Sequence, residues 1–98
     1  MFAFFVLSAV VPLSAVIVGG WTTRDVNDPD VIRVAKESLA AMTICPVSLK
    51  IISAKSQVVA GVKYDIQLVY APDFNQIHEL VVVEQPWEKE PLDILSYT

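Results

Sequence analysis

Residues 57–70 read QVVAGVKYDIQLVY, and this stretch decides the fold. Apolar and polar side chains alternate over most of residues 62–70, a period of two that predicts a half-buried β-strand. The preceding residues 47–56 are rich in β-branched side chains and predict a second strand. Residues 57–61 then form a hairpin tip that is apolar, although turns favour Asn, Asp, Gly or Pro.

Upstream of this hairpin, the sequence predicts one amphipathic helix at about residues 29–42. Asp28 can cap the free backbone amides, and Pro29 suits the first helical position because its missing N–H costs nothing there. Apolar residues at spacings of three and four predict the buried stripe, which consists of Ile32, Ala35, Leu39 and Met42. Pro46 ends the helical stretch, since the residue before a proline avoids the helical region.

Downstream, the pattern continues with strands and turns. Residues 71–76 contain Pro, Asp and Asn and predict a loop, residues 77–84 a strand, residues 85–88 a second turn and residues 92–97 a last short strand. One helix followed by consecutive antiparallel strands is typical of an α+β domain. We expect an N-terminal amphipathic helix packed across a four- to five-stranded antiparallel sheet.

The N-terminus is the most apolar part of the 98-residue chain. No charged side chain precedes Arg24, and residues 1–11 are apolar apart from Ser8. An apolar core followed by small residues is typical of a secretory signal peptide, here residues 1–15, with residues 16–98 as the mature domain. The alternative is an uncleaved membrane anchor, but the run barely reaches the ~20 residues that a span needs. We therefore expect a secreted, extracellular protein that is not bound to a membrane once the leader is removed.

Charge and composition exclude several function classes. The net charge is −4, with no basic stripe, which argues against nucleic-acid binding. Cys45 and His78 are the only Cys and His; they are too few for a tetrahedral metal site, and no catalytic motif surrounds either. No glycine-rich phosphate loop is present. We expect no enzyme activity, no catalytic residue, no metal and no cofactor.

The single cysteine bears on how the domain is held together. With Cys45 alone, no intramolecular disulfide can form, so packing must hold the domain. We expect Cys45 to be buried, as free cysteines often are, and His78 to be a partly exposed strand residue.

Three apolar segments are expected to project from one end of the sheet. In consecutive antiparallel strands alternate turns lie at the same end, which brings residues 57–61 close to Pro86-Trp87. An N-terminal segment running alongside the sheet would add Val18-Gly19-Gly20 to this row. An exposed tryptophan is costly without a partner and is frequent among binding hot spots. The row therefore predicts an apolar wedge that enters a cleft of a partner protein.

Each projection also has a purely structural interpretation. Val58 and Val59 can be ordinary strand residues, with the turn moved onto Ala60 and Gly61. Trp87 can fold back onto the domain, and the N-terminal glycines can form a linker after the signal peptide.

At these residues the sequence resembles the cystatin family. Residues 57–61 match the QxVxG loop motif of that family, and Pro86-Trp87 is similar to its second-loop Pro-Trp pair. Val18-Gly19-Gly20 is similar to the family's N-terminal glycine preceded by an apolar residue. Residues 55–61, and Glu90-Pro91-Leu92 leading to Tyr97, resemble most the stefin branch, which lacks disulfides. The Pro-Trp pair and the signal peptide resemble the secreted branch.

The resemblance implies reversible, competitive inhibition of papain-like cysteine proteases of the cathepsin type. In matching positions, Gly19 would lie near the catalytic centre of the protease and Val18 in a non-primed pocket. The first loop would fill the middle of the cleft and the second loop its primed side. The implied protease-binding residues are Val18, Gly19, Gln57, Val58, Val59, Ala60, Gly61, Pro86 and Trp87.

Two further interpretations stay open from the residues. The first is a cystatin-fold interaction module that does not inhibit and is anchored to a membrane by an uncleaved leader, which would encumber Gly19. The second concerns assembly: we expect a monomer, but strain at Val58 and Val59 in a tight turn would favour a domain-swapped dimer.

Overall fold

A computed structural model describes residues 20–98 of the chain. The predicted signal peptide, Val18 and Gly19 lie outside the described residues. The elements follow in the order β1 (Thr22–Arg24), α1 (Pro29–Ala41), β2 (Leu49–Val59), β3 (Gly61–Tyr70), β4 (Asp73–Glu84) and β5 (Leu92–Tyr97).

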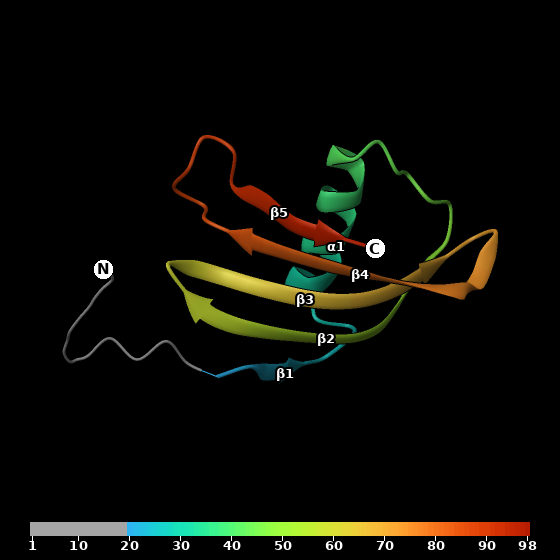
Figure 1. Cartoon of the computed structure of the whole chain (residues 1–98), viewed down its shortest axis with the longest axis horizontal. Coiled ribbons are helices and arrows are strands. Elements are labelled where there is room, and N and C mark those ends of the chain that lie inside the picture. Colours follow the sequence, from blue (N-terminus) through green and yellow to red (C-terminus); the bar gives the residue numbers. More distant parts are fainter. Residues whose placement is uncertain (1–19) are drawn as a thin grey trace.

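The predicted α+β architecture is confirmed. The strands form one five-stranded antiparallel sheet in the order β1-β2-β3-β4-β5, and α1 crosses one of its faces (Figure 1). Each strand pairs with its neighbour in sequence: tight turns connect β2, β3 and β4, and the connection from β1 to β2 runs through α1. The strand that the sequence does not indicate is the short β1, which pairs with β2. Its residues are polar and show no strand pattern of their own.

The helix begins where the sequence predicts. Asp28 Oδ1 accepts a hydrogen bond from the Asp30 backbone N–H at 2.8 Å, and Pro29 is the first helical residue. Arg24 donates to Asp28 Oδ2 at 2.7 Å, and this guanidinium is the main cause that lowers the pKa of the Asp28 carboxyl. One carboxylate therefore caps α1 and ties it to β1.

The buried face of α1 differs from the predicted stripe. Ala35 and Leu39 are buried as expected, but Ile32 and Met42 are only half-buried. The fully buried positions of the helix are Val31, Val34, Ala35, Ser38 and Leu39. The sequence places two apolar residues side by side in successive turns of the helix, so its pattern allows two neighbouring faces, and packing against the sheet selects one of them.

The strands are longer than the sequence predicts. The expected loop at residues 71–76 is wrong in extent: Ala71 and Pro72 form the turn, and β4 begins at Asp73, which lies opposite Tyr70. The Asp and Asn that suggest a loop are accommodated within the strand, where Asp73 Oδ1 accepts the Asn75 N–H at 2.9 Å. Local turn preference thus gives way to pairing along a long hairpin.

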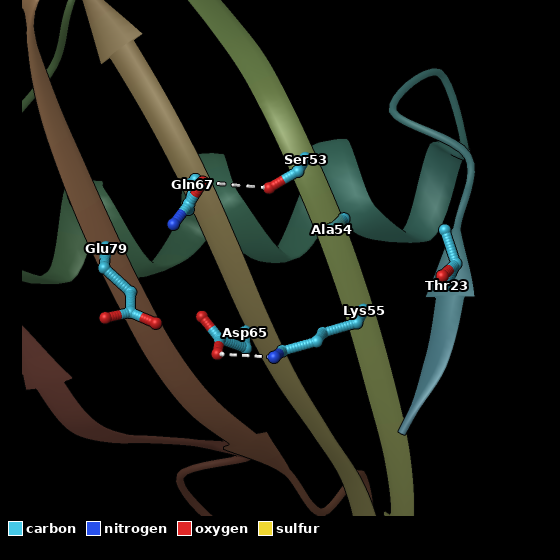
Figure 2. Close-up of a pocket in the computed structure, with 7 residues that line it drawn as sticks. All are labelled: Thr23, Ser53, Ala54, Lys55, Asp65, Gln67 and Glu79. Atoms are coloured by element: carbon cyan, nitrogen blue, oxygen red, sulfur yellow. Dashed lines mark hydrogen bonds and ion pairs between the residues drawn. The ribbon is translucent and has the colours of Figure 1, made fainter. Parts of the chain in front are cut away.

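The core lies between α1 and one face of the sheet, here called the inner face. Its buried sheet residues are Ala54, Tyr64, Ile66, Leu68, Leu80 and Val82. The alternating side chains point away from the helix, on the outer face, and include Lys55, Asp65 and Glu79 (Figure 2). This one-sided burial is the period of two seen in the sequence of β3.

The two residues with reactive side chains have different surroundings. Cys45 is exposed in the loop between α1 and β2, so the expected burial is wrong. The helix ends at Ala41 and Thr43 adopts a φ of 61°, which redirects the chain before Cys45. His78 is half-buried, as predicted, and its ring stacks on Tyr70 at 4.9 Å and on Tyr97 at 5.2 Å between centroids.

Candidate functional site

Three segments of the chain meet at one end of the sheet, here called the hairpin end. The β2–β3 hairpin reverses there, the β4–β5 turn lies beside it, and β1 starts from the same side (Figure 1, left). The first residue of β1, Thr22, lies opposite Ser56, two residues before Val58, and Gly20 precedes Thr22 by two residues. The expected gathering is confirmed for these segments, while Val18 and Gly19 lie outside the described residues.

The first tip is tighter than predicted. β2 continues to Val59 and β3 starts at Gly61, so Ala60 alone separates the two strands. Val58 lies opposite Val62, and Val59 lies opposite Gly61. The expected loop is therefore wrong in extent, and both valines belong to β2. Even so, the Val58 side chain is 66% exposed and stands as an apolar projection at the end of the sheet.

Gly61 allows the second turn to approach the first. Its φ is +114°, a region that L side chains rarely adopt. A Cβ at this position would collide with the backbone oxygen of Glu84 and lie 3.0 Å from Cγ of Gln85. Any side chain here would push the end of β4 away from the tip of the β2–β3 hairpin.

Gln85 joins the two turns directly. Its Nε2 donates a hydrogen bond to the backbone oxygen of Ala60 at 2.8 Å. Its backbone N–H donates to Pro91 O at 2.7 Å, and its carbonyl accepts the Glu88 N–H at 2.9 Å. The residue thus closes the β4–β5 turn and positions it against the first tip. The sequence pattern does not indicate a role for Gln85, and its place just before Pro86 is the available signal.

An ion pair fixes the base of this arrangement to the helix. Arg33 donates to both carboxylate oxygens of Glu84, at 2.7 and 3.0 Å, and the Glu84 side chain is only 13% exposed. A two-bond contact between guanidinium and carboxylate restricts orientation as well as distance. The hydrogen bond that Arg33 donates to Glu84 is the main cause that raises the pKa of Arg33. The last residue of β4 is therefore held by both α1 and the sheet.

The second tip presents an exposed tryptophan. Trp87 is 66% exposed, so the structural alternative in which it folds back onto the domain is wrong. Pro86 before it is exposed as well, and so are Glu88, Lys89 and Glu90 after it. Together with Val58, Trp87 gives the hairpin end two large apolar side chains that are open to a partner.

A second tryptophan lies at the same end and was not predicted as a site residue. Trp21 is 41% exposed just before β1. The ammonium of Lys55 lies 5.2 Å, and that of Lys63 5.7 Å, from the centroid of its ring. Both distances are within the range of cation–π attraction. The available signal in the sequence was that Trp21 directly follows the two glycines.

The outer face next to this end carries a shallow polar depression of about 220 Å³ (Figure 2). It is lined by Thr23, Ser53, Ala54, Lys55, Asp65, Gln67 and Glu79. Lys55 Nζ lies 3.7 Å from Asp65 Oδ2, while Asp65 Oδ1 is buried without a hydrogen-bond partner. The neighbouring Asp65 carboxyl raises the pKa of Glu79, because a protonated Glu79 can donate a hydrogen bond to it.

Two other features of the described residues bear on function. Residues 20–98 hold no group of three or more His, Cys, Asp or Glu side chains that could bind a metal ion. In the same residues, no helix is long and apolar enough to cross a membrane.

Comparison with curated proteins finds two relatives. The chain is 38% identical to U7-hexatoxin-Hi1a of Hadronyche infensa over 69 residues, which cover 60% of this chain and 62% of the relative. It is 44% identical to Cystatin-1 of Chilobrachys guangxiensis over 62 residues, which cover 55% of this chain and 45% of the relative. The matched segments thus cover about half of the length of these relatives.

The other comparisons give no match: no family model and no solved structure matches the chain. The similarity to Cystatin-1 supports a cystatin-like relationship, which agrees with the resemblance carried by the loop motifs.

Proposed function

We propose that this protein is a reversible, competitive inhibitor of papain-like cysteine proteases of the cathepsin type. The observation that carries the proposal is the braced apolar end of the sheet, where Val58 and Trp87 are each 66% exposed. The similarity to Cystatin-1 supports an inhibitor rather than an enzyme. We call Gly20, Val58, Val59, Ala60 and Trp87 the wedge.

The wedge would act by filling the active-site cleft. Burial of apolar side chains contributes roughly 25 cal/mol per Å² before the costs of association are subtracted. Those costs are reduced here because Gln85 and Gly61 already hold the two tips in one arrangement. Blockage would be steric: the wedge occupies the cleft and offers the protease thiolate no peptide bond in a reactive geometry.

The N-terminal segment would extend the wedge. In this proposal Gly19 lies near the catalytic centre of the protease and Val18 fills a non-primed pocket. Gln57, Val59 and Ala60 face the middle of the cleft, and Pro86 stands with Trp87 on the primed side. We further propose that residues 1–15 are removed as a signal peptide, so that residues 16–98 act outside the cell as a monomeric, disulfide-free inhibitor with a stefin-like character.

The proposal is tested by titrating a papain-like endopeptidase with residues 16–98 and with two variants. Trp87→Ala removes an exposed aromatic side chain from the wedge. Phe74→Ala removes another, 48% exposed, from the opposite end of the sheet. We expect competitive inhibition that Trp87→Ala weakens roughly tenfold or more and Phe74→Ala leaves unchanged. Absence of inhibition by a folded wild-type protein would exclude the inhibitor function.

A further inference from the structure

One side of the wedge carries an aromatic and cationic surface outside the loop motifs. It consists of Trp21, Lys55 and Lys63 and is called the β1 patch. Both ammonium groups lie within 6 Å of the Trp21 ring centroid, at 5.2 and 5.7 Å. The ring nevertheless remains 41% exposed, so the two lysines border the tryptophan without covering it.

The β1 patch is continuous with the first tip. Thr22 lies opposite Ser56, so the pairing continued by one residue places Trp21 beside Gln57. Gln57 in turn lies opposite Lys63. A row of neighbouring residues therefore runs from Trp21 across Gln57 to Lys63, directly behind Val58 and Ala60. A partner protein whose cleft receives the tip of the β2–β3 hairpin would therefore contact this row next.

The charge of the β1 patch is available to a partner. Within residues 20–98, the ion pairs of the structure leave Lys63 without a carboxylate partner. Lys55 has a single long contact, 3.7 Å to Asp65, and its side chain is 49% exposed. Lys55 is exposed and Lys63 half-buried, and cations beside an aromatic ring favour a partner that brings carboxylates to them.

The opposite side of the wedge has the reverse sign. The β4–β5 turn exposes Glu88, Lys89 and Glu90, two acidic groups against one basic group. The chain as a whole carries a net charge of −4, so the cationic β1 patch stands out against its background. Such asymmetry gives a docking protein a preferred orientation and a charge-dependent association rate.

We propose that the β1 patch is a further contact surface that selects among papain-like proteases, favouring those with carboxylates along the border of the cleft that faces β1. The proposal rests on the inhibitory function proposed above. Trp21 would pack against that border, and Lys63 would meet its carboxylates. Trp is enriched among residues that dominate interface energies, and charges at an interface rim act mainly on the association rate.

The test uses two folded papain-like endopeptidases, one with an acidic and one with a basic cleft border. Inhibition constants and association rates are measured for the wild type, Trp21→Ala and Lys63→Glu, at about 50 and about 500 mM salt. Controls at other places are Phe74→Ala and Lys50→Glu, whose side chains are exposed. Thermal unfolding of each variant is recorded in parallel.

For the acidic protease, we expect Trp21→Ala to weaken inhibition roughly tenfold at both salt concentrations. Lys63→Glu should slow association roughly tenfold at low salt, and the difference should shrink at high salt because ions screen it. The same variant should associate faster with the basic protease. Phe74→Ala and Lys50→Glu should match the wild type.

Two results would overturn the proposal, and they are distinguishable. If the wild type inhibits both proteases and the patch variants behave like their controls, the β1 patch makes no contact and only the selection is lost. If the folded wild type inhibits neither protease, the proposed function fails and the β1 patch has no role in it. Should Trp21→Ala fail to fold, the rates of Lys63→Glu and their salt dependence decide alone.

Discussion

The two ends of the sheet both expose apolar side chains, but they are built differently. At the far end, Val47 is 101%, Ile77 56% and Phe74 48% exposed, comparable with Val58 and Trp87 at the hairpin end. At the hairpin end, however, Gln85 bonds Ala60 across the two turns. Arg33 holds the base of the same turns through Glu84.

This difference shows that exposure alone does not identify a binding surface. Val47 lies in the loop after α1, and Phe74 and Ile77 lie in the part of β4 before its pairing with β5. The hairpin end instead brings residues from separate segments together and braces them from behind. An arrangement that is fixed before binding loses less conformational entropy on binding, which is the property an inhibitor needs.

The largest effect is expected from Gly61→Ala, which breaks the approach of the two turns. The added Cβ collides with the Glu84 oxygen at a φ of +114°, so strain of roughly 1–3 kcal/mol and displacement of the β4–β5 turn are expected. Inhibition of a papain-like protease should fall roughly a hundredfold, and the melting temperature should fall with it. Phe74→Ala, at the far end of the sheet, is the control and should leave inhibition unchanged. Equal inhibition by both variants would contradict the close-approach argument.

An intermediate effect is expected from Gln85→Ala, which removes the bond between the turns but leaves their apolar side chains. The lost hydrogen bond is exposed, so stability should change by about 1 kcal/mol or less. Inhibition should weaken roughly tenfold, because the tips must then be ordered during binding. Gln76→Ala is the control: it removes an exposed amide of β4 near the far end of the sheet and should leave both quantities unchanged. A larger inhibition constant at an unchanged melting temperature would show that Gln85 acts by holding the two turns together.

The smallest effect is expected from Glu79→Gln on the outer face, between the two ends. Asp65 raises the pKa of Glu79 in the folded state, so the folded protein binds that proton more tightly than the unfolded chain. The stabilising contribution is therefore present below the ordinary carboxyl pKa and is lost as the pH rises through the raised pKa. Glu79→Gln should remove this loss and raise the melting temperature slightly at neutral pH, with inhibition unchanged. The stability change is measured from melting curves of the wild type and Glu79→Gln between about pH 4 and 7. A lower melting temperature of Glu79→Gln at neutral pH would contradict this prediction.

Local rules were sufficient for part of the fold. The start of α1 depends on Asp28 and Pro29, which are neighbours in sequence, and the period of two in β3 needs only its own side chains. Where a segment was compatible with both a turn and a strand, its sequence did not decide between them. Residues 71–76 contain turn-forming residues, yet β4 begins at Asp73 because pairing with β3 satisfies its backbone. The exposure of Cys45 follows from the path of the chain after Thr43, which no local pattern specified.

The residues of the candidate site also fall into two groups, those predicted from the sequence and those found only in the structure. The apolar residues of both tips were found from the sequence because they break the usual composition of turns. Gln85 and Trp21 were missed, since a glutamine before a proline and a tryptophan after two glycines have no unusual composition of their own. Their roles appear only once β4 lies against the β2–β3 hairpin and β1 lies against β2.

The sequence by itself determined that this chain forms one helix and an antiparallel sheet with apolar turns, because periodicity, capping and turn chemistry act between near neighbours. Only the tertiary structure decided which face of α1 is buried, that Gln85 reaches Ala60, and that Trp21 stands beside Lys55 and Lys63. Those contacts join residues that are far apart in the chain, and they depend on strand register and packing, which no single segment contains.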